Sequence, residues 1–341
     1  MLAFATMRNI LNMPRKKILM KEPRQIAVFS QDRVHELRLE LARKITEFMG
    51  PAEDKATDIP GVSLHRRSAP TPPCRTTYHP GIIVIAQGRK QVSLGRASFF
   101  YDPSHFLLTA VDLPTVSRVV EATKELPCLA LTLKLDMSMV RELLGREEIH
   151  VAEAPPDAPA MSTSETTPEF LNACCRLVDL LSSPQDVPFL SGLIQREIIY
   201  RVLRSPEGAR LRAIATLGDQ SHRTAKAVAW ITSNYARPLR VEDLAQVASM
   251  GVSTLHYHFR MLTAMTPLQY QKQLRLQAAR SLMLNSGRDA ASAAFEVGYE
   301  SPTQFSREYS RFFGQPPIRD VHALRESGAR TSDPMTNQQT A

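Results

Sequence analysis

An internal repeat constrains the fold of this chain more than any other feature of its sequence. Residues 251–267 recur 50 positions later, at 301–317, with the apolar positions in register. The matched pairs are Gly251 with Ser301, Leu255 with Phe305, Phe259 with Tyr309, Leu262 with Phe312, Ala264 with Gly314 and Pro267 with Pro317. Within each copy the apolar residues lie three or four positions apart, which predicts an amphipathic helix with a buried stripe.

Each copy follows another short helical pattern, and together they form two helical pairs. The preceding segments are VEDLAQVA at 241–248 and DAASAAFEV at 289–297, each joined by a turn of three to four residues. Small Ala294 lets two helices approach, and Gly298 allows positive φ in the turn. This is the pattern of a helix-turn-helix, whose second helix enters a DNA major groove. The segment 266–284 between the pairs is compatible with one continuous linker helix.

Positive charge is concentrated in the same part of the chain. The 341 residues carry a formal net charge of +8. From Ser221 to Arg325 there are 13 Lys and Arg against 7 Asp and Glu, so this segment supplies +6 of that total. An excess of positive charge in one domain indicates a polyanionic partner.

The N-terminal half shows a different periodicity. A helix capped by Ser30 is expected, with Val34, Leu37 and Leu41 facing inward, before a proline-rich stretch. From Tyr78 to Asp136, short apolar runs are separated by glycine and proline, and the LALTLKLD segment alternates as a half-buried strand does. Several such strands predict a sandwich or barrel. Helical patterns follow, with 151–167 read as a loop and 205–221 as a hinge.

Residues for catalysis or metal binding do not come together in the sequence. His79 and His105 are isolated, and His256 and His258 would point about 200° apart on a helix. We find no phosphate-binding loop, nucleophile elbow or metalloprotease motif. The four cysteines form no C-x-x-C, which favours reduced thiols in a cytoplasmic protein, and no apolar run reaches the ~20 residues of a membrane span. We therefore expect no metal, no cofactor and no enzymatic activity.

Residues 224–325 resemble the AraC/XylS family of bacterial transcription regulators. The resemblance is carried by LAQVASM, the spacing of Leu255 and Phe259, TPLQYQKQLRLQAAR and GYESPTQFSREYSRFFGQPP. Most of residues 40–215 resemble the cupin-like N-terminal domain of one AraC-type subfamily, through TTYHPGIIVIAQGRKQVSLG, YDPSHFLL, VDLPTVSRVVEA and REIIYRVLRSPEGARLR.

The resemblance implies which side chains face DNA. By position, the base-facing residues are Ser253, His256, Tyr257, Thr303, Gln304 and Arg307. Arginine can donate twice to guanine, and glutamine can pair with adenine. The first residues of the two helices, Gly251 and Ser301, would offer backbone N–H groups to phosphate. The first copy departs from the family at two capping positions, because Gly251 and Arg240 stand where serine or threonine is usual, and Ser249 replaces the turn glycine.

The sequence thus predicts an α+β multidomain protein. It would have a disordered tail at 1–29, a cupin-like β-barrel domain with helices at 30–215 for effector binding or dimerisation, an all-α domain with two helix-turn-helix units at 221–325, and a second disordered tail at 326–341. The apolar faces around Leu177 and Ile198 form either core or a dimer interface.

The predicted function is that of a one-component, sequence-specific DNA-binding transcription regulator, with activation favoured over repression. Its expected partners are promoter or operator DNA, a small-molecule effector whose binding residues are unknown, RNA polymerase and a second copy of the chain, and no membrane. Two alternatives stay open: an architectural, sequence-tolerant DNA-binding protein and a cupin-type enzyme.

Overall fold

The structure is a computed structural model that describes residues 23–145 and 159–326. The predicted tails at 1–29 and 326–341 lie outside the described residues, except for Glu326, which ends the last helix, and the segment from Pro23 to Phe29. That segment belongs to the first helix, α1 (Pro23–Met49), so Ser30 lies inside the helix and does not cap it. The predicted inward face is correct from Val34 onward, because Val34, Leu37 and Leu41 are buried.

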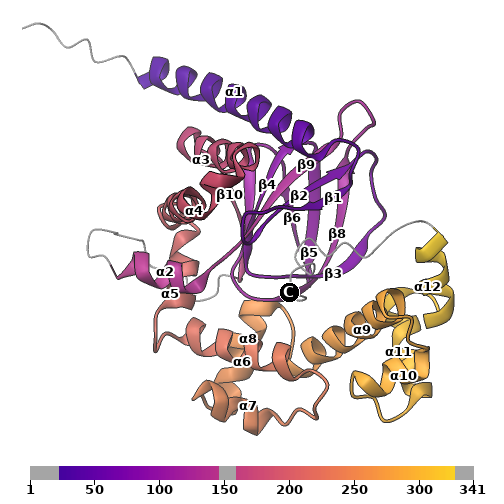
Figure 1. The fold of residues 1–341 in the computed structure, drawn as a ribbon. Helices are drawn as coiled ribbons and strands as arrows, with labels where there is room; N and C mark the ends of the chain where they lie inside the picture. The colour runs from indigo at the N-terminus through magenta and orange to yellow at the C-terminus, as the bar shows by residue number, and fades with distance from the viewer. Residues whose placement is uncertain (1–22, 146–158, 327–341) are drawn as a thin grey trace, which may run out of the picture.

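Ten antiparallel strands form two sheets in the N-terminal domain (Figure 1). The larger sheet has the order β1-β2-β9-β4-β7-β10, and the smaller has the order β3-β8-β5-β6. The strands are β1 (Asp54–Ala56), β2 (Val62–Arg67), β3 (Cys74–Tyr78), β4 (Gly81–Gln87), β5 (Arg89–Leu94), β6 (Ala97–Tyr101), β7 (His105–Thr109), β8 (Leu113–Glu121), β9 (Cys128–Lys134) and β10 (Met161–Glu165). The two sheets face each other, as expected for a barrel or sandwich.

The alternating strand predicted within 129–136 is buried on both faces up to Leu133, with Lys134 exposed at its end, and not on one face as its sequence predicted. This strand is β9, where Ala130 and Thr132 are as buried as the leucines between them. Helices pack on one side of the larger sheet, as the stacking of Phe106 in β7 on Phe170 of the third helix at 4.6 Å illustrates. The smaller sheet covers the other side (Figure 1). A central strand between two layers loses the polar face that half-burial would require.

Four strands lie where the sequence predicted irregular structure. β1, β2 and β3 lie between the first predicted helix and Tyr78, and β10 lies within the segment predicted as a loop. β10 pairs only with β7, and β3 only with β8, so both are edge strands. Such short edge strands form through tertiary pairing, which local propensity does not reveal.

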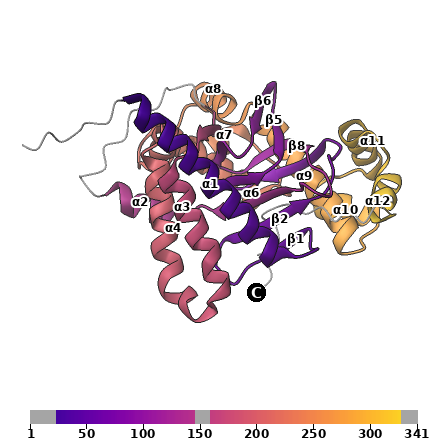
Figure 2. The same cartoon turned by 90° about the horizontal axis from the view of Figure 1, so that it is seen from above.

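Helix α1 packs on the larger sheet against β2, β4 and β9, and further helices pack on α1 and on one another. They are α2 (Met137–Leu144), α3 (Pro168–Asp179), α4 (Val187–Leu203) and α5 (Gly208–Ala215), with short 3-10 turns at Leu180–Ser182 and Pro184–Asp186. Seen from above, α1 crosses over α3, against which it packs, and α3 packs against α4 (Figure 2). Leu177 and Ile198 are both buried, so their faces belong to the core of one chain. The predicted hinge at 205–221 is largely wrong, because α5 fills it and packs on its neighbours.

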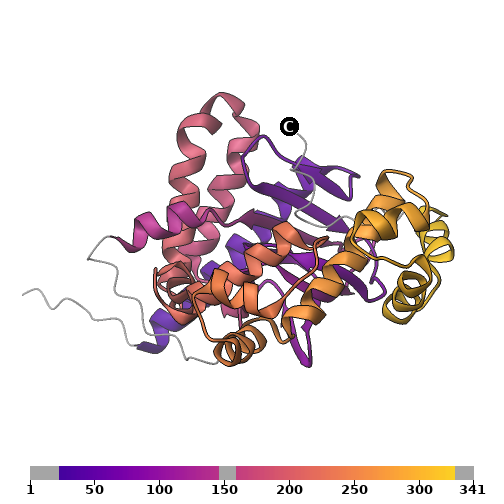
Figure 3. The ribbon, with the colours of Figure 1, turned by 90° about the horizontal axis from the view of Figure 1, so that it is seen from below.

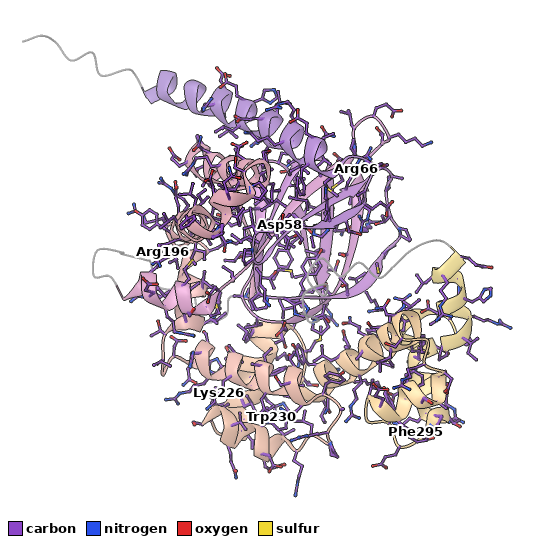
Figure 4. All side chains as sticks on the ribbon, in the orientation of Figure 1. Asp58, Arg66, Arg196, Lys226, Trp230 and Phe295 are labelled. Carbon is purple, nitrogen blue, oxygen red and sulfur yellow. The ribbon has the colours of Figure 1, made fainter. Side chains whose placement is uncertain are left out.

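Seven helices complete the described chain, along one end of the sheets (Figure 3). They are α6 (Gln220–Asn234), α7 (Val241–Ala248), α8 (Val252–Thr263), α9 (Pro267–Asn285), α10 (Ala290–Glu296), α11 (Pro302–Phe313) and α12 (Pro317–Glu326). The predicted linker helix is continuous as α9, and a capping box of Thr266 and Gln269 starts it. None of the described helices is long and apolar enough to cross a membrane.

The buried side chains divide into two cores within α9, and not between the N-terminal and helical domains. One core runs without interruption from the sheets into α6, α7, α8 and the first half of α9. The other is formed by the second half of α9 with α10, α11 and α12, around Phe305 and Tyr309. The first helical pair therefore shares its interior with the N-terminal domain, whereas the second has an interior of its own.

Candidate nucleic-acid interface

The two helical pairs have the same turn, built from different residues. In the first pair Ser249 adopts a left-handed conformation with φ of 53°, and in the second Gly298 does so with φ of 88°. The next amide closes the turn in both cases: Met250 N donates to Ala245 O and Tyr299 N donates to Ala294 O, each at 2.9 Å. The left-handed backbone conformation favours glycine because it crowds a Cβ atom. Ser249 is therefore strained in this conformation, whereas Gly298 is not.

Burial along the two second helices, α8 and α11, repeats at the same 50-residue interval as the sequence. Leu255 and Phe259 are fully buried in α8, and Phe305 and Tyr309 are fully buried in α11. Between these anchors both helices show the same sequence of exposed and half-buried positions. The repeat therefore produces two equivalent helices with equivalent outward faces.

The predicted DNA-facing residues lie on these outward faces. Most are exposed: Gly251, Ser253, Tyr257, Thr303, Gln304 and Arg307. His256 and Ser301 are half-buried. All eight lie in the N-terminal half of their helix or at the residue just before it. This is the part of a recognition helix that contacts base edges.

Two further positions of this face were absent from the predicted set. Thr254 is exposed and matches Gln304, whereas Ser306 is half-buried and matches His256. Both follow from applying the 50-residue register to every predicted residue, so the signal was already in the sequence. A complete pair of faces therefore includes Thr254 and Ser306.

Tyr257 and Arg307 occupy the same position in the two helices and give them different chemistry. Tyr257 is 54% exposed and contacts the ring of His258 edge-on, with 5.1 Å between ring centres. Arg307 is exposed, and the described structure gives it no hydrogen bond or ion pair. A free guanidinium can donate to two acceptors of one guanine, whereas a phenol offers one donor or acceptor.

Glu308, which is half-buried on α11, contacts one of the outward-facing side chains of that helix. Its carboxylate accepts a hydrogen bond from the Tyr299 hydroxyl at 2.9 Å, pairs with Lys272 Nζ at 2.9 Å and lies 3.4 Å from Gln304 Nε2. Burial alone would raise the pKa of Glu308, but these donors outweigh it and the pKa is lowered. The anionic carboxylate restrains the side-chain amide of Gln304, which stands at the outer surface.

The helix starts differ as their sequences predict. Ser301 caps α11 by accepting a hydrogen bond from Gln304 N at 3.3 Å. Gly251 precedes α8 and has no side chain to offer, and Arg240 makes no side-chain cap for α7. The first unit thus leaves more amide donors at its helix starts open to an external acceptor.

The opposite ends of both helices contact the N-terminal domain. Leu262 O, near the end of α8, accepts a hydrogen bond from Ala160 N at 3.0 Å. At the matching position near the end of α11, the Phe312 ring lies 4.2 Å from the guanidinium carbon of Arg75 in β3. The N-terminal domain therefore holds the C-terminal ends of α8 and α11, and their N-terminal faces stay uncovered.

Two histidine side chains contact aspartates, and three of the four cysteine side chains are buried. His79 and His105 each contact an aspartate, Asp112 and Asp102 respectively. Among the described residues no three or more His, Cys, Asp or Glu side chains gather as a metal site. Cys128, Cys174 and Cys175 are buried free thiols, and burial raises the pKa of Cys175 to about 12.

Comparison with known proteins places both parts of the chain. A family model described as the AraC-type transcriptional regulator N-terminus matches residues 58–210. A helix-turn-helix domain model matches residues 244–320, which include both units described above. The chain belongs to the AraC family of transcriptional regulators.

Curated AraC-family relatives match the chain over part of its length. The HTH-type transcriptional regulator ArgR of Pseudomonas aeruginosa is 25% identical over 153 residues, 45% of this chain and 46% of ArgR. The HTH-type transcriptional activator RhaS of Klebsiella pneumoniae is 30% identical over 137 residues, 40% of this chain and 48% of RhaS. The chain thus spans about half the length of the curated relatives that it matches.

Solved structures of ToxT from Vibrio cholerae O395 share the fold. ToxT bound to (E)-4-(8-methylnaphthalen-1-yl)but-3-enoic acid aligns with a TM-score of 0.52 at 13% identity, over 77% of this chain and 98% of ToxT. The sheet-rich domain followed by a helical domain is therefore the shared architecture.

Proposed function

We propose that this protein is a one-component transcription regulator that binds specific DNA sequences with both helix-turn-helix units. The observation that carries the proposal is the repeated pattern of burial on α8 and α11. It leaves two polar faces exposed, with Arg307 on one and Tyr257 on the other. Each face would enter one of two successive major-groove segments, about 10 bp apart on one side of the duplex. Bending of the DNA would help both to fit.

A footprint of the full-length chain on the DNA flanking its own gene tests this function. We expect protection of two adjacent major-groove segments that resists random competitor DNA at near-physiological salt. Protection of one segment alone would restrict the function to a single unit.

The rival function is architectural DNA binding without sequence preference. The excess of positive charge from Ser221 to Arg325 supports it, because phosphate contacts alone give affinity. Diffuse protection that competitor DNA removes, with a steep salt dependence and equal affinity for all duplexes, would favour the rival and contradict the main proposal.

We further propose that the N-terminal domain binds a small organic molecule. Support comes from the shared fold with ToxT, for which a structure with a bound unsaturated fatty acid also aligns, with a TM-score of 0.50 at 13% identity. A ligand that binds only the folded state raises its stability. Thermal unfolding with a panel of carboxylic acids and sugars tests this, and no shift with either class would count against these effectors.

We also propose a homodimer through α4. This helix exposes Phe189 and Leu193, which lie four residues apart on one face. Phe189 is 77% exposed to solvent and Leu193 is 62% exposed. Apolar side chains repeated on an exposed helix face are typical of an interaction surface. Light scattering of the wild type and of Phe189→Glu tests it: equal masses would contradict the dimer.

Of the relatives named above, ArgR is named a transcriptional regulator and RhaS a transcriptional activator. We propose that this chain activates transcription in the cytoplasm, through contact with RNA polymerase, and that it has no enzymatic activity. Transcription in vitro from a footprinted promoter tests the direction of regulation, since a fall in transcript on adding the protein would indicate a repressor.

A further inference from the structure

The two helix-turn-helix units meet directly, in addition to being joined by α9. The contact lies between the C-terminal end of α6, which packs on α7 and α8 and is counted with the first unit, and the turn of the second unit at Gly298. A Cβ atom placed on Gly298 would lie 1.9 Å from Ala236 O and 2.8 Å from Ala236 C. Because both atoms belong to the backbone, no side-chain movement would relieve the clash. The absence of a side chain at Gly298 therefore allows this approach.

Arg275, in the middle of α9, ties the two units together at this contact. Its guanidinium donates to three carbonyls at the end of α6: Tyr235 O at 2.7 Å, Arg237 O at 2.9 Å and Ala236 O at 3.2 Å. It also donates to Gly298 O, in the turn of the second unit, at 2.9 Å. Four of its five N–H donors are used, all on backbone oxygens from the two units.

Further contacts strengthen the link that Arg275 makes between the end of α6 and the second unit. Tyr235 is the C-cap of α6, and the C-terminal end of a helix carries partial negative charge, which suits a guanidinium. Gln271, one turn earlier on α9, also donates to Tyr235 O and Arg237 O, at 2.9 and 2.7 Å. The Tyr235 side chain packs against both hydrophobic cores. The end of α6 is thus fixed to α9 and to the second unit by several contacts.

We propose that Arg275 is a positioning residue that sets the spacing and rotation between the two DNA half-sites. It contacts no residue of the outward faces, so its role is to fix one recognition helix relative to the other. The inference rests on the proposed DNA-binding function. It predicts that the two units read one fixed separation, because a rigid pair cannot follow a half-site that is displaced along the helical DNA.

A distance measurement without DNA tests the rigidity separately from DNA binding. Spin labels at Gln246→Cys in α7 and Ala291→Cys in α10 report the separation of the units, in a background where exposed Cys74 is changed to serine. We expect a narrow distance distribution in the otherwise wild-type chain and a broad one in Arg275→Ala. Gly298→Ala, which disturbs the same contact without removing a charge, should shift the mean distance.

A spacing series on DNA tests the consequence for specificity. Inserting one base pair between the half-sites should weaken wild-type binding by about 100-fold, the loss expected when two linked units can no longer bind together. For Arg275→Ala the loss should be below about tenfold, while affinity for a single half-site stays unchanged. Arg275→Lys keeps the charge but cannot reach four carbonyls, so it should behave like the alanine variant.

Two controls separate Arg275 from other causes. Arg319→Ala removes an exposed charge from α12 and should change neither the distance distribution nor the spacing preference. Arg75→Ala removes the contact between the N-terminal domain and Phe312 while leaving Arg275 in place. Unfolding temperatures close to wild type confirm that each variant is folded.

The outcomes divide as follows. A narrow distribution in Arg275→Ala, or an unchanged spacing preference in that variant, would overturn the proposal. Broadening in Arg75→Ala but not in Arg275→Ala would also overturn it, because the N-terminal domain would then set the spacing. If the wild type binds no DNA specifically, the proposed function fails, and the distance measurement still decides whether Arg275 holds the units together.

Discussion

The guanidinium of Arg75, in a strand of the N-terminal domain, rests on the ring of Phe312 near the end of the second recognition helix, 4.2 Å from the ring centre. Arg280 lies 4.3 Å from the ring of Phe313, and the two phenylalanine rings meet edge to face at 4.8 Å. Burial, and then the nearby charge of Arg280, lower the pKa of Arg75. A cation on an aromatic ring thus joins the second unit to the N-terminal domain.

Arg75 and Phe312 should be energetically coupled. A partly buried cation–π pair contributes about 0.5–2 kcal/mol, and a double-mutant cycle isolates that amount. We expect this coupling in the free energy of unfolding for Arg75→Ala combined with Phe312→Leu, measured by urea denaturation. The leucine keeps an apolar side chain but removes the ring. Strictly additive effects of the two substitutions would mean that the ring and the guanidinium do not interact.

Arg307→Ala should weaken binding to the specific site by about 1–3 kcal/mol and relax the preference at one base pair. The reason is that Arg307 is the exposed arginine at the matched position of Tyr257, where a bidentate contact with guanine fits. Binding to the site and to all single base-pair variants measures this. Arg311→Ala, on the same helix one turn later, removes the same charge from an exposed position. An equal loss on specific and random DNA in Arg307→Ala would assign Arg307 to phosphate.

The two helix starts should respond to substitution in opposite directions. Ser301→Ala removes a side-chain cap and should lower the free energy of unfolding by about 1 kcal/mol. Gly251→Ser should raise it by a few tenths of a kcal/mol, because Gly251 has an extended conformation (φ −68°, ψ 150°) and a Cβ there would lie 3.8 Å from Thr254 Oγ1. Thermal unfolding compares the two. Destabilisation by Gly251→Ser would show that the first unit needs glycine for another reason.

The N-terminal domain should lose stability in acid through Asp54. Burial would raise the pKa of this carboxyl, but the hydrogen bond from His65 and the charge of Arg67 lower it to about 2, from 3.8. Since the folded pKa is depressed, the stabilisation is complete above about pH 4 and disappears as the pH falls toward 2. It amounts to about 2 kcal/mol. The stability difference between wild type and Asp54→Asn should be constant at neutral pH and shrink below pH 4. A difference independent of pH would contradict this role.

The helical half of the fold was readable from the sequence because its signals are local. Apolar spacing predicts α7, α8, α9 and α11. In the structure the side chains of Asp289 and Ser301 cap α10 and α11 by accepting hydrogen bonds from residues two or three positions along the chain. The repeat also indicated that the polar faces of α8 and α11 would be equivalent. These features depend on residues within a few turns of one another.

The remaining features depend on contacts between distant segments. β10 exists because β7 lies beside it, and β9 is buried on both sides because α1 and the smaller sheet cover it. Neither condition is visible in a single strand. In the sequence Arg275 is one residue of a linker helix, because its four acceptors lie 23 to 40 positions away along the chain. Its role appears only once the end of α6 and the turn at Gly298 are brought together.

The division of the buried side chains into two cores determines which parts of the molecule unfold together. The sheets and the first helical unit form one cooperative block, so amide protons in α8 should exchange with solvent at rates set by the opening of the sheets. The second unit can open by itself. A ligand that stabilises the sheets would therefore slow amide exchange in the first recognition helix, α8, directly. It would affect α11 only through the few side chains that contact both cores.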